Sequence, residues 1–152
     1  MPDATAFELA LNAPENGFNE TARQNRQAII DAYKAILKGD EAALIRLLDP
    51  NVLFVEAAGL PYGCEYRGVE GVQKGVEGMF GAWSKLRVVI EECVAGSDLV
   101  IAYMTMKATS RKTGKVYDGY TAELFRFKNG KITEWRPIYW DTHAVRVACG
   151  LA

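Results

Sequence analysis

Histidine and cysteine are scarce in this chain, and their small numbers argue against metal sites and disulfide bonds. His143 is the only histidine, and no cluster of carboxylates accompanies it, so a metal ion is not expected. The three cysteines, Cys64, Cys93 and Cys149, lie far apart and form no C-x-x-C pair. This spacing argues against a disulfide framework and against a structural zinc site. We therefore expect inert thiols and no bound metal.

An excess of charge and long apolar runs are also missing. The 18 basic and 19 acidic residues leave a net charge of −1, and the basic residues are scattered, so a nucleic-acid partner is not expected. No run approaches the roughly 18 apolar residues of a membrane span. The N-terminus carries Asp3 where a signal peptide has basic residues. These features predict a soluble, cytoplasmic protein that binds neither nucleic acid nor membrane.

The first residues differ in character from the rest of the chain. Residues 1–18 carry two prolines, a glycine and several asparagines around one short apolar stretch, which predicts a loosely attached arm. The remainder has an ordinary globular composition without internal repeats or a linker, and a chain of 152 residues is the size of one domain. We place this single domain at residues 19–148.

Three helices are expected before most of the strands. Apolar residues recur every three or four positions over residues 29–37 and 69–83, which is the pattern of an amphipathic helix. Between these segments, Asp40 can cap a shorter helix. That helix should end at Asp49, because the residue before a proline is disfavoured in the α region. A long loop rich in glycine and tyrosine follows over residues 57–68, and such loops often cover binding sites.

The rest of the chain alternates in the manner of β-strands. Strands are expected over residues 51–56, 86–95, 99–109 and 116–127 and after Asn129-Gly130. Asn-Gly suits the two φ > 0 positions of a type I′ turn, so the last two strands should form a hairpin. Short connections make neighbouring strands antiparallel. Pro137 cannot donate to a ladder, which predicts a sheet edge or a bulge in the last strand.

The strand expected at residues 99–109 is apolar on both of its faces over residues 99–106, which bears on whether the chain forms a dimer. Its two sets of apolar side chains are Val100, Ala102, Met104 and Met106 on one face and Leu99, Ile101 and Tyr103 on the other. The helices can cover only one face of the sheet, so the other face requires a partner chain. We expect a homodimer that packs sheet to sheet.

Two acidic residues fall among aromatic neighbours. Glu56 closes the first strand on the face that carries Phe54, and Glu123 shares a face with Phe125. A carboxyl group is costly in apolar surroundings unless it belongs to a site. Burial raises a carboxyl pKa, and a second acid nearby separates the two values. One glutamate can then act as a base while the other donates a proton, which suits proton abstraction next to a carbonyl.

Ordinary structural roles are the alternatives to these chemical ones. Glu123 can pair with a basic residue or turn to solvent, and Arg136 suits a solvated strand position as well as a place between the acids. Asp141 can cap a turn through local backbone hydrogen bonds. The tyrosines, Tyr33 and Tyr62 among them, suit a core or a pocket rim, and together they offer hydroxyls to an apolar, oxygenated ligand.

The order of elements resembles the nuclear transport factor 2-like superfamily, whose enzymes include ketosteroid isomerases and SnoaL-like polyketide cyclases. Leu-Lys-Gly-Asp at 37–40, Tyr-Arg-Gly at 66–68 and Arg-Phe-Lys-Asn-Gly-Lys-Ile at 126–132 fall in the superfamily's order. The resemblance implies a conical α+β fold. In that fold three N-terminal helices pack on a strongly curved, mixed but mostly antiparallel sheet around a pocket, commonly as a dimer.

The resemblance also implies roles for individual residues. Glu56 falls where ketosteroid isomerases place an Asp general base, and Glu123 falls where they keep an Asp protonated as a donor to the oxyanion. Trp140 falls on their pocket tryptophan, and Tyr33 lies near their oxyanion-hole tyrosine. In SnoaL-like cyclases a pocket Asp or His does the acid–base work, and Asp141 or His143 is the nearest counterpart here.

Two hypotheses follow for the function. One is a cofactor-free isomerase or cyclase that acts by acid–base chemistry on a hydrophobic, oxygenated small molecule, and the other is a non-catalytic module that binds such a molecule. An interaction domain working through the outer sheet face would compete with the dimer for that face. The catalytic candidates are Glu56, Glu123, Asp141 and Tyr33. The candidate ligand-binding residues are Phe54, Tyr62, Met79, Trp83, Tyr103, Phe125, Arg136 and Trp140.

Overall fold

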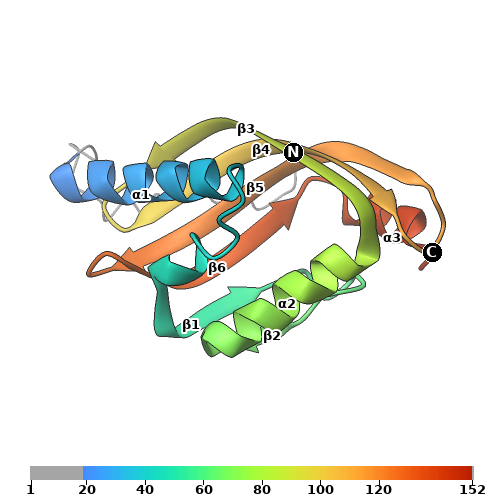
Figure 1. Ribbon diagram of the computed structural model, residues 1–152, viewed down its shortest axis with the longest axis horizontal. Helices are drawn as coiled ribbons and strands as arrows, with labels where there is room; N and C mark the ends of the chain where they lie inside the picture. The colour runs from blue at the N-terminus through green and yellow to red at the C-terminus, as the bar shows by residue number, and fades with distance from the viewer. Residues whose placement is uncertain (1–18, 152) are drawn as a thin grey trace, which may run out of the picture.

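The computed structural model describes residues 19–151, and within them it contains three α-helices and one six-stranded sheet (Figure 1). The arm predicted for residues 1–18 lies outside the described residues. The elements follow one another as α1 (Glu20–Ile36), the 3-10 helix η1 (Ile45–Leu47), β1 (Leu48–Val55), β2 (Glu65–Arg67), α2 (Gly68–Ala82), β3 (Trp83–Ala95), β4 (Leu99–Ser110), β5 (Val116–Lys128), β6 (Lys131–Tyr139) and α3 (Thr142–Ala148).

The sheet has the strand order β2-β1-β6-β5-β4-β3. β1 and β6 run parallel, and every other neighbouring pair is antiparallel. The sheet curls without closing: α1 packs on β3 and β4, and α2 packs on β1 and β2 and also reaches β3 (Figure 1). The expected α+β class and the curved, mostly antiparallel sheet are confirmed.

The prediction of a helix between Asp40 and Asp49 is wrong. The chain makes turns there and the short helix η1, and it enters β1 at Leu48, which pairs with Ile132 of β6. The Asp40 carboxylate forms an ion pair with Arg46 instead of capping a helix. Apolar residues of this segment are buried in the core at positions that β1 pairing requires, so tertiary contacts override the local helical pattern.

The third helix lies at the other end of the chain. α3 begins after Asp141, whose carboxylate oxygen accepts a hydrogen bond from the Ala144 amide at 2.8 Å. α2 ends one residue earlier than expected, because Trp83 has extended backbone angles and is the first residue of β3. α2 therefore leads into the sheet without a loop.

The hairpin between β5 and β6 is confirmed. Asn129 and Gly130 both have positive φ, at 51° and 73°, as a type I′ turn requires. The predicted bulge at Pro137 is wrong, because the register shift falls between Arg126 and Phe127. β6 is also an interior strand, and Pro137 is tolerated because β1 pairs with β6 only as far as Trp135.

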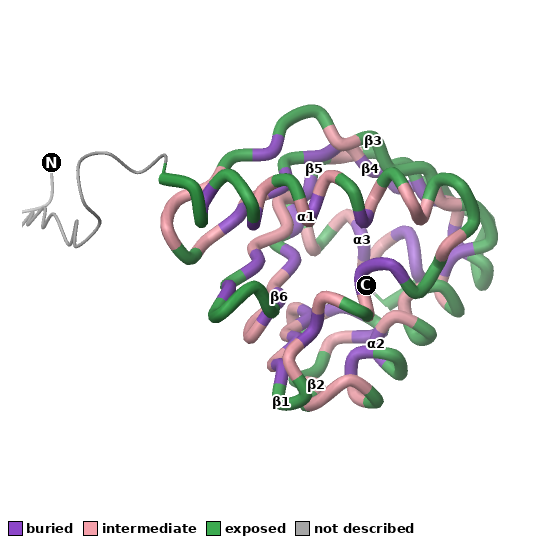
Figure 2. The backbone as a smooth tube through the Cα atoms, turned by 60° about the vertical axis from the view of Figure 1, so that its left-hand side comes forward, coloured by how far each residue is buried: buried purple, intermediate pink, exposed green. Residues whose placement is uncertain are grey.

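Buried residues alternate with exposed ones along the strands, so that one face of the sheet forms the core (Figure 2). The core has two parts. One part is built around Trp135, whose ring lies tilted against Phe54 with centroids 4.5 Å apart and stacked on Phe125 with centroids 5.6 Å apart. The part near α3 contains several tyrosines, Trp83 and residues of loop 57–64.

The packing of α2 on β1 predicts the effect of adding one methyl group. A Cβ atom on Gly75 would lie 2.7 Å from the Phe54 ring and 2.9 Å from the Tyr66 ring. Gly75→Ala should therefore lower the free energy of unfolding by about 1–3 kcal/mol despite the better helix propensity of alanine. Gly81→Ala, in the same helix with nothing within 4 Å of its Cβ, should leave stability unchanged or raise it. Chemical denaturation measures both, and equal effects would contradict the packing.

Candidate functional site

The strand register brings Glu56 and Glu123 to the same level of the inner face. Phe54 on β1 pairs with Trp135 on β6, and Trp135 pairs with Phe125 on β5. The next inward-facing residue on the same side is Glu56 after Phe54, Pro137 after Trp135, and Glu123 before Phe125. Neighbouring strands are about 4.8 Å apart, so the backbones at the two glutamates are separated by about 10 Å. Only the short Pro137 side chain lies between them.

Glu123 is held by two hydrogen-bond donors from different elements. The Tyr33 hydroxyl of α1 donates to Glu123 Oε2, and Trp135 Nε1 of β6 donates to the same oxygen at 3.2 Å. Desolvation raises the pKa of Glu123 to about 7, and these two hydrogen bonds oppose the rise. Burial and the charge of Glu123 raise the pKa of Tyr33, which keeps its hydroxyl protonated. Glu123 thus ionises close to neutral pH.

Glu56 has lost more hydration than Glu123. Its exposed fraction is 2%, and neither carboxylate oxygen has a hydrogen-bond partner among residues 19–151. Desolvation raises the pKa of Glu56 to about 8, and the charge of Glu123 adds to the rise. The Tyr139 hydroxyl lies near enough to oppose the rise in part, without a hydrogen bond of ordinary geometry. In the free protein Glu56 is therefore the more readily protonated acid, the reverse of the order that the resemblance implies.

A pair of tyrosines lies beside Glu56. The Tyr62 hydroxyl donates to the Tyr139 hydroxyl at 3.1 Å, and both residues are buried. Tyr62 belongs to loop 57–64, which is fixed to α3 because Arg146 Nη1 donates to the Gly59 carbonyl at 2.7 Å. Burial raises the pKa of both tyrosines, so both remain neutral phenols. The loop thus closes the α3 end of the interior.

Several of the expected site residues do face the interior. Phe54, Phe125 and Trp83 are buried on the inner face, and Met79 packs against the core near α3. Sequence reasoning overlooked Trp135 and Tyr139 as site residues. Both share the inner face of β6 with Pro137, so the period-2 pattern of that strand contained the signal.

Three expected lining residues lie outside the interior, so that expectation is wrong for them. Tyr103 is 39% exposed on the outer face, because its neighbours Ala102 and Met104 point inward. Trp140 is 84% exposed, since it follows the inward-facing Tyr139. Arg136 lies between two inward-facing residues and pairs with Glu134 at 3.0 Å. In each case strand alternation turns the side chain outward.

Asp141 does not join the glutamates either. It is exposed, and its carboxylate caps α3, which is the local structural role that its sequence context allowed. His143 is also exposed, in the first turn of the same helix.

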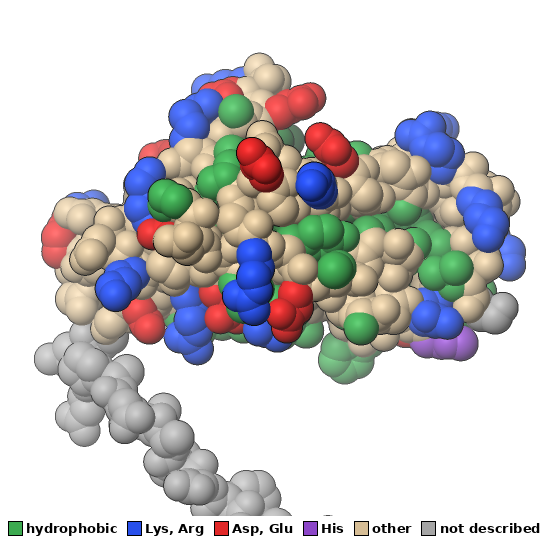
Figure 3. All heavy atoms as spheres, turned by 90° about the horizontal axis from the view of Figure 1, so that it is seen from below, with side chains coloured by type: hydrophobic (Ala, Val, Ile, Leu, Met, Phe, Trp, Pro, Cys, Tyr) green, Lys and Arg blue, Asp and Glu red, His purple; other side chains and the backbone are tan. Residues whose placement is uncertain are grey.

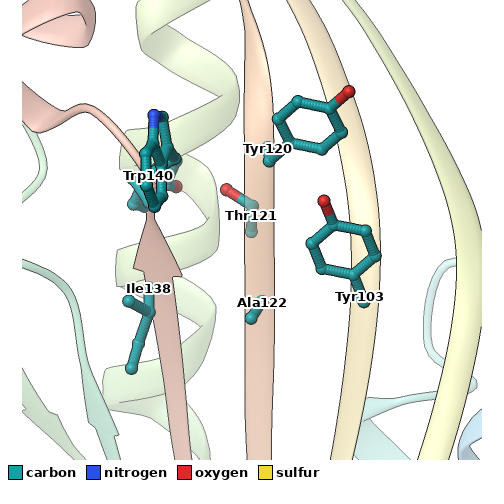
Figure 4. A pocket seen from close by; sticks show the side chains of 7 residues that line it. Tyr103, Tyr120, Thr121, Ala122, Ile138 and Trp140 are labelled. Atoms are coloured by element: carbon teal, nitrogen blue, oxygen red, sulfur yellow. The ribbon is translucent and has the colours of Figure 1, made fainter.

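An open groove of about 700 Å³ lies along the outer face of the sheet, and the inward-facing residues Thr121 and Tyr139 also border it. Tyr103 and Tyr120 stack there with ring centroids 5.6 Å apart, and Ile138 and Trp140 lie across β5 from them (Figure 4). Seen from below, hydrophobic side chains gather toward the α3 end of the molecule, and basic side chains lie around that end (Figure 3). The groove is thus a mainly apolar surface, and neither glutamate is among the residues that line it.

The family follows from a match along most of the chain. The family model for the SnoaL-like domain matches residues 29–135. The chain therefore belongs to the SnoaL-like family, within the superfamily that its sequence resembles. No match was found among curated proteins.

Solved structures agree with this fold. An NTF2-like protein from Burkholderia thailandensis is 27% identical, with a TM-score of 0.74 over 82% of this chain and 95% of that one. A proposed SnoaL-like polyketide cyclase from Jannaschia sp. CCS1 is 16% identical, with a TM-score of 0.74 over 89% and 97% of the two chains. TerC, co-crystallised with polyporic acid, is 22% identical, with a TM-score of 0.72 over 84% and 98%.

Residues 19–151 also bear on membrane and metal binding. None of the helices there is long and apolar enough to span a membrane. No three histidine, cysteine, aspartate or glutamate side chains in this part of the chain are grouped so that they could hold a metal ion.

The raised pKa of Glu56 predicts a stability that depends on pH. Between its ordinary value of 4.5 and the folded value of about 8, the folded state retains a proton that the unfolded state has lost. The free energy of unfolding should therefore fall as pH rises through this window, by about 1.4 kcal/mol per pH unit from this group. Glu56→Gln removes the effect, so its stability relative to wild type should increase from pH 4.5 to pH 8.

Chemical denaturation across this pH range measures the difference between the two proteins. Glu77→Gln, at an exposed position of α2, is the matched control and should parallel wild type. A constant difference between Glu56→Gln and wild type at all pH values would contradict the burial of an uncharged carboxyl group.

Proposed function

We propose that the protein binds a neutral, hydrophobic, oxygen-bearing small molecule against the inner face of the sheet and moves a proton on it with its own carboxyl groups. The observation that carries this proposal is the pair of interior glutamates, whose pKa values are raised to about 8 and about 7 on either side of Pro137. Buried acids that titrate near neutral pH are suited to general acid–base chemistry. A flat apolar ligand suits the aromatic surroundings.

The hydrogen bonds suggest which acid does what. Glu123 receives two donors, which favour its carboxylate form, so it is the base that removes a proton from the carbon next to a carbonyl. The electron pair of the broken C–H bond becomes a C=C bond, and the π pair of the carbonyl moves to its oxygen, which gives an enolate. Glu56, protonated and without a partner, donates its O–H to that oxygen. Where the ligand carries a C=C bond conjugated with this enolate, return of the proton from Glu123 to the far carbon of that bond re-forms the carbonyl, leaves Glu56 with its proton and completes an isomerisation.

A model ketone tests this division of roles. In D₂O, the protein should accelerate deuterium exchange at the α-carbons of 2-tetralone, followed by proton NMR. The rate should rise as Glu123 ionises near pH 7 and fall as Glu56 ionises near pH 8. Glu123→Gln should lower the rate at least about 100-fold. Glu56→Gln retains an N–H donor, so it should keep part of the activity and lose the fall at high pH.

Glu134→Gln, on the outer face of β6, is the control and should exchange as wild type does. If Glu56→Gln were inactive and Glu123→Gln active, the roles would be those that the resemblance implies. Binding of 2-tetralone without any exchange would leave the non-catalytic binding module as the function.

We also propose that the groove on the outer face is the contact between two copies of this chain. Tyr120, Ile138 and Trp140 are exposed by 47%, 48% and 84%, which is unusual for neighbouring large apolar side chains. A two-fold axis would lay the two sheets face to face and cover these groups in both copies. This contact would leave the inner faces free for ligands.

Native mass spectrometry and sedimentation test the dimer. The wild-type chain should be a dimer, and Ile138→Asp should be mainly a monomer, because a carboxylate would be placed in the apolar contact. Leu37→Asp, at an exposed apolar residue beyond the end of α1, is the matched control and should remain dimeric. A monomeric wild-type chain would refute the proposal.

A further inference from the structure

We propose that the interior holds a second, oxygen-binding subsite, formed by Trp83, Tyr117 and Thr121 and distinct from the glutamate pair. It rests on the proposed function, because it would bind the far end of the same ligand. The ligand would then be an apolar molecule with an uncharged oxygen function at each end.

The three side chains share an uncommon property. Trp83 Nε1, the Tyr117 hydroxyl and Thr121 Oγ1 have no hydrogen-bond partner within residues 19–151, although the residues are only 3%, 3% and 4% exposed. The Trp83 indole lies near the Tyr62 hydroxyl, but without the geometry of a hydrogen bond. Buried polar groups in folded proteins are nearly always paired, so such groups indicate a partner from outside the chain.

These groups gather in one region of the molecule. In the described part of the chain, the only other buried side-chain atoms without a partner are the two carboxylate oxygens of Glu56. Trp83 and Tyr117 pack in the core near α3 together with Tyr62 and Tyr139. Thr121 pairs with Tyr139 across β5 and β6. The unpartnered groups thus continue from Glu56 along the inner face toward α3.

Gly119 shows where the Tyr117 hydroxyl points. A Cβ atom on Gly119 would overlap the hydroxyl oxygen and ring of Tyr117. The Tyr117 ring therefore lies along β5, over Gly119, with its hydroxyl directed toward Thr121. Because Tyr117, Thr121 and Glu123 share one face of β5, the hydroxyl groups and the carboxyl group lie in one row.

The chemistry of the donors defines the class of ligand. An indole N–H can only donate, and the two hydroxyls can donate as well, so the subsite suits an oxygen acceptor. No lysine or arginine is buried in the described part of the chain, so no buried cation is available for a carboxylate or phosphate. The oxygen would be that of a carbonyl, ether or hydroxyl group.

The spacing along β5 sets the length of the ligand. At about 3.3 Å per residue, Thr121 lies about 7 Å from Glu123, and the Tyr117 hydroxyl above Gly119 lies about 13 Å from it. A rigid body of a few fused six-membered rings spans such a distance. The stacked Phe54, Trp135 and Phe125 rings occupy the level on the other side of the glutamates, so the ligand would extend toward α3.

Two naphthols that differ by one hydroxyl test the subsite by calorimetry. 2,6-Dihydroxynaphthalene has an oxygen at each end, and 2-naphthol has only one. The wild-type protein should bind the diol about five- to tenfold more tightly, the effect of one or two net hydrogen bonds. Trp83→Phe, Tyr117→Phe and Thr121→Val should each reduce this preference at least about twofold while leaving the affinity for 2-naphthol nearly unchanged. Thr109→Val, at an outward-facing position of β4 outside the groove, should have no effect.

The three tryptophans report where the ligand sits, even if a variant folds poorly. In ¹⁵N spectra of tryptophan-labelled wild-type protein, the Trp135 indole N–H reports on Glu123, that of Trp83 on the proposed subsite and that of Trp140 on the outer groove. The diol should shift the signals of Trp83 and Trp135, 2-naphthol should shift one of these two, and neither should shift Trp140.

The outcomes separate the two proposals. If the diol shifts Trp135 without Trp83 and binds no better than 2-naphthol, the subsite is refuted and the proposed function stands. If neither compound binds, or only the Trp140 signal moves, the proposed interior ligand site is refuted and the subsite with it.

Discussion

The withdrawal of two carboxyl groups from water is the constraint on which the rest of the site depends. Glu56 is buried and Glu123 half-buried on the inner side of a curved sheet, where an unpaired charge is unfavourable. Glu123 is compensated by Tyr33 and Trp135, whereas Glu56 has no partner in the described chain. This difference in hydrogen bonding separates their proton affinities. Pro137, with a short side chain between them, lets one influence the other.

Each element around the pair supplies part of this arrangement. α1 brings Tyr33 over the sheet, and β6 brings Trp135 to the same oxygen. The aromatic rings on one side of the pair supply a single polar group, the Trp135 indole N–H, which donates to Glu123 and leaves Glu56 without a partner. On the other side, loop 57–64 is tied to α3 through Arg146 and closes the interior with the Tyr62–Tyr139 pair. The fold thus places the aromatic support at one end and the hydroxyl groups at the other.

Features that depend only on residues adjacent in the chain were predicted correctly from the sequence. Asn129-Gly130 requires positive φ and so specifies the hairpin, and period-2 alternation placed Glu123 and Phe125 on one face. The same rule would have excluded Tyr103 from the interior, since its neighbours face inward. The helix expected after Asp40 failed for a different reason, because pairing of Leu48 with Ile132 outweighs a weak local preference.

The sequence by itself determined the family, the α+β class and the inward direction of both glutamates, because superfamily motifs, turn chemistry and strand alternation are local properties of the chain. Only the tertiary structure decided which acid holds its proton more tightly. That order depends on the hydrogen bonds that Glu123 receives from Tyr33 of α1 and from Trp135 of β6, two elements other than its own strand. It also depends on how completely each carboxyl group loses water. Desolvation and hydrogen bonding across elements are properties of the packed molecule, which no sequence pattern records.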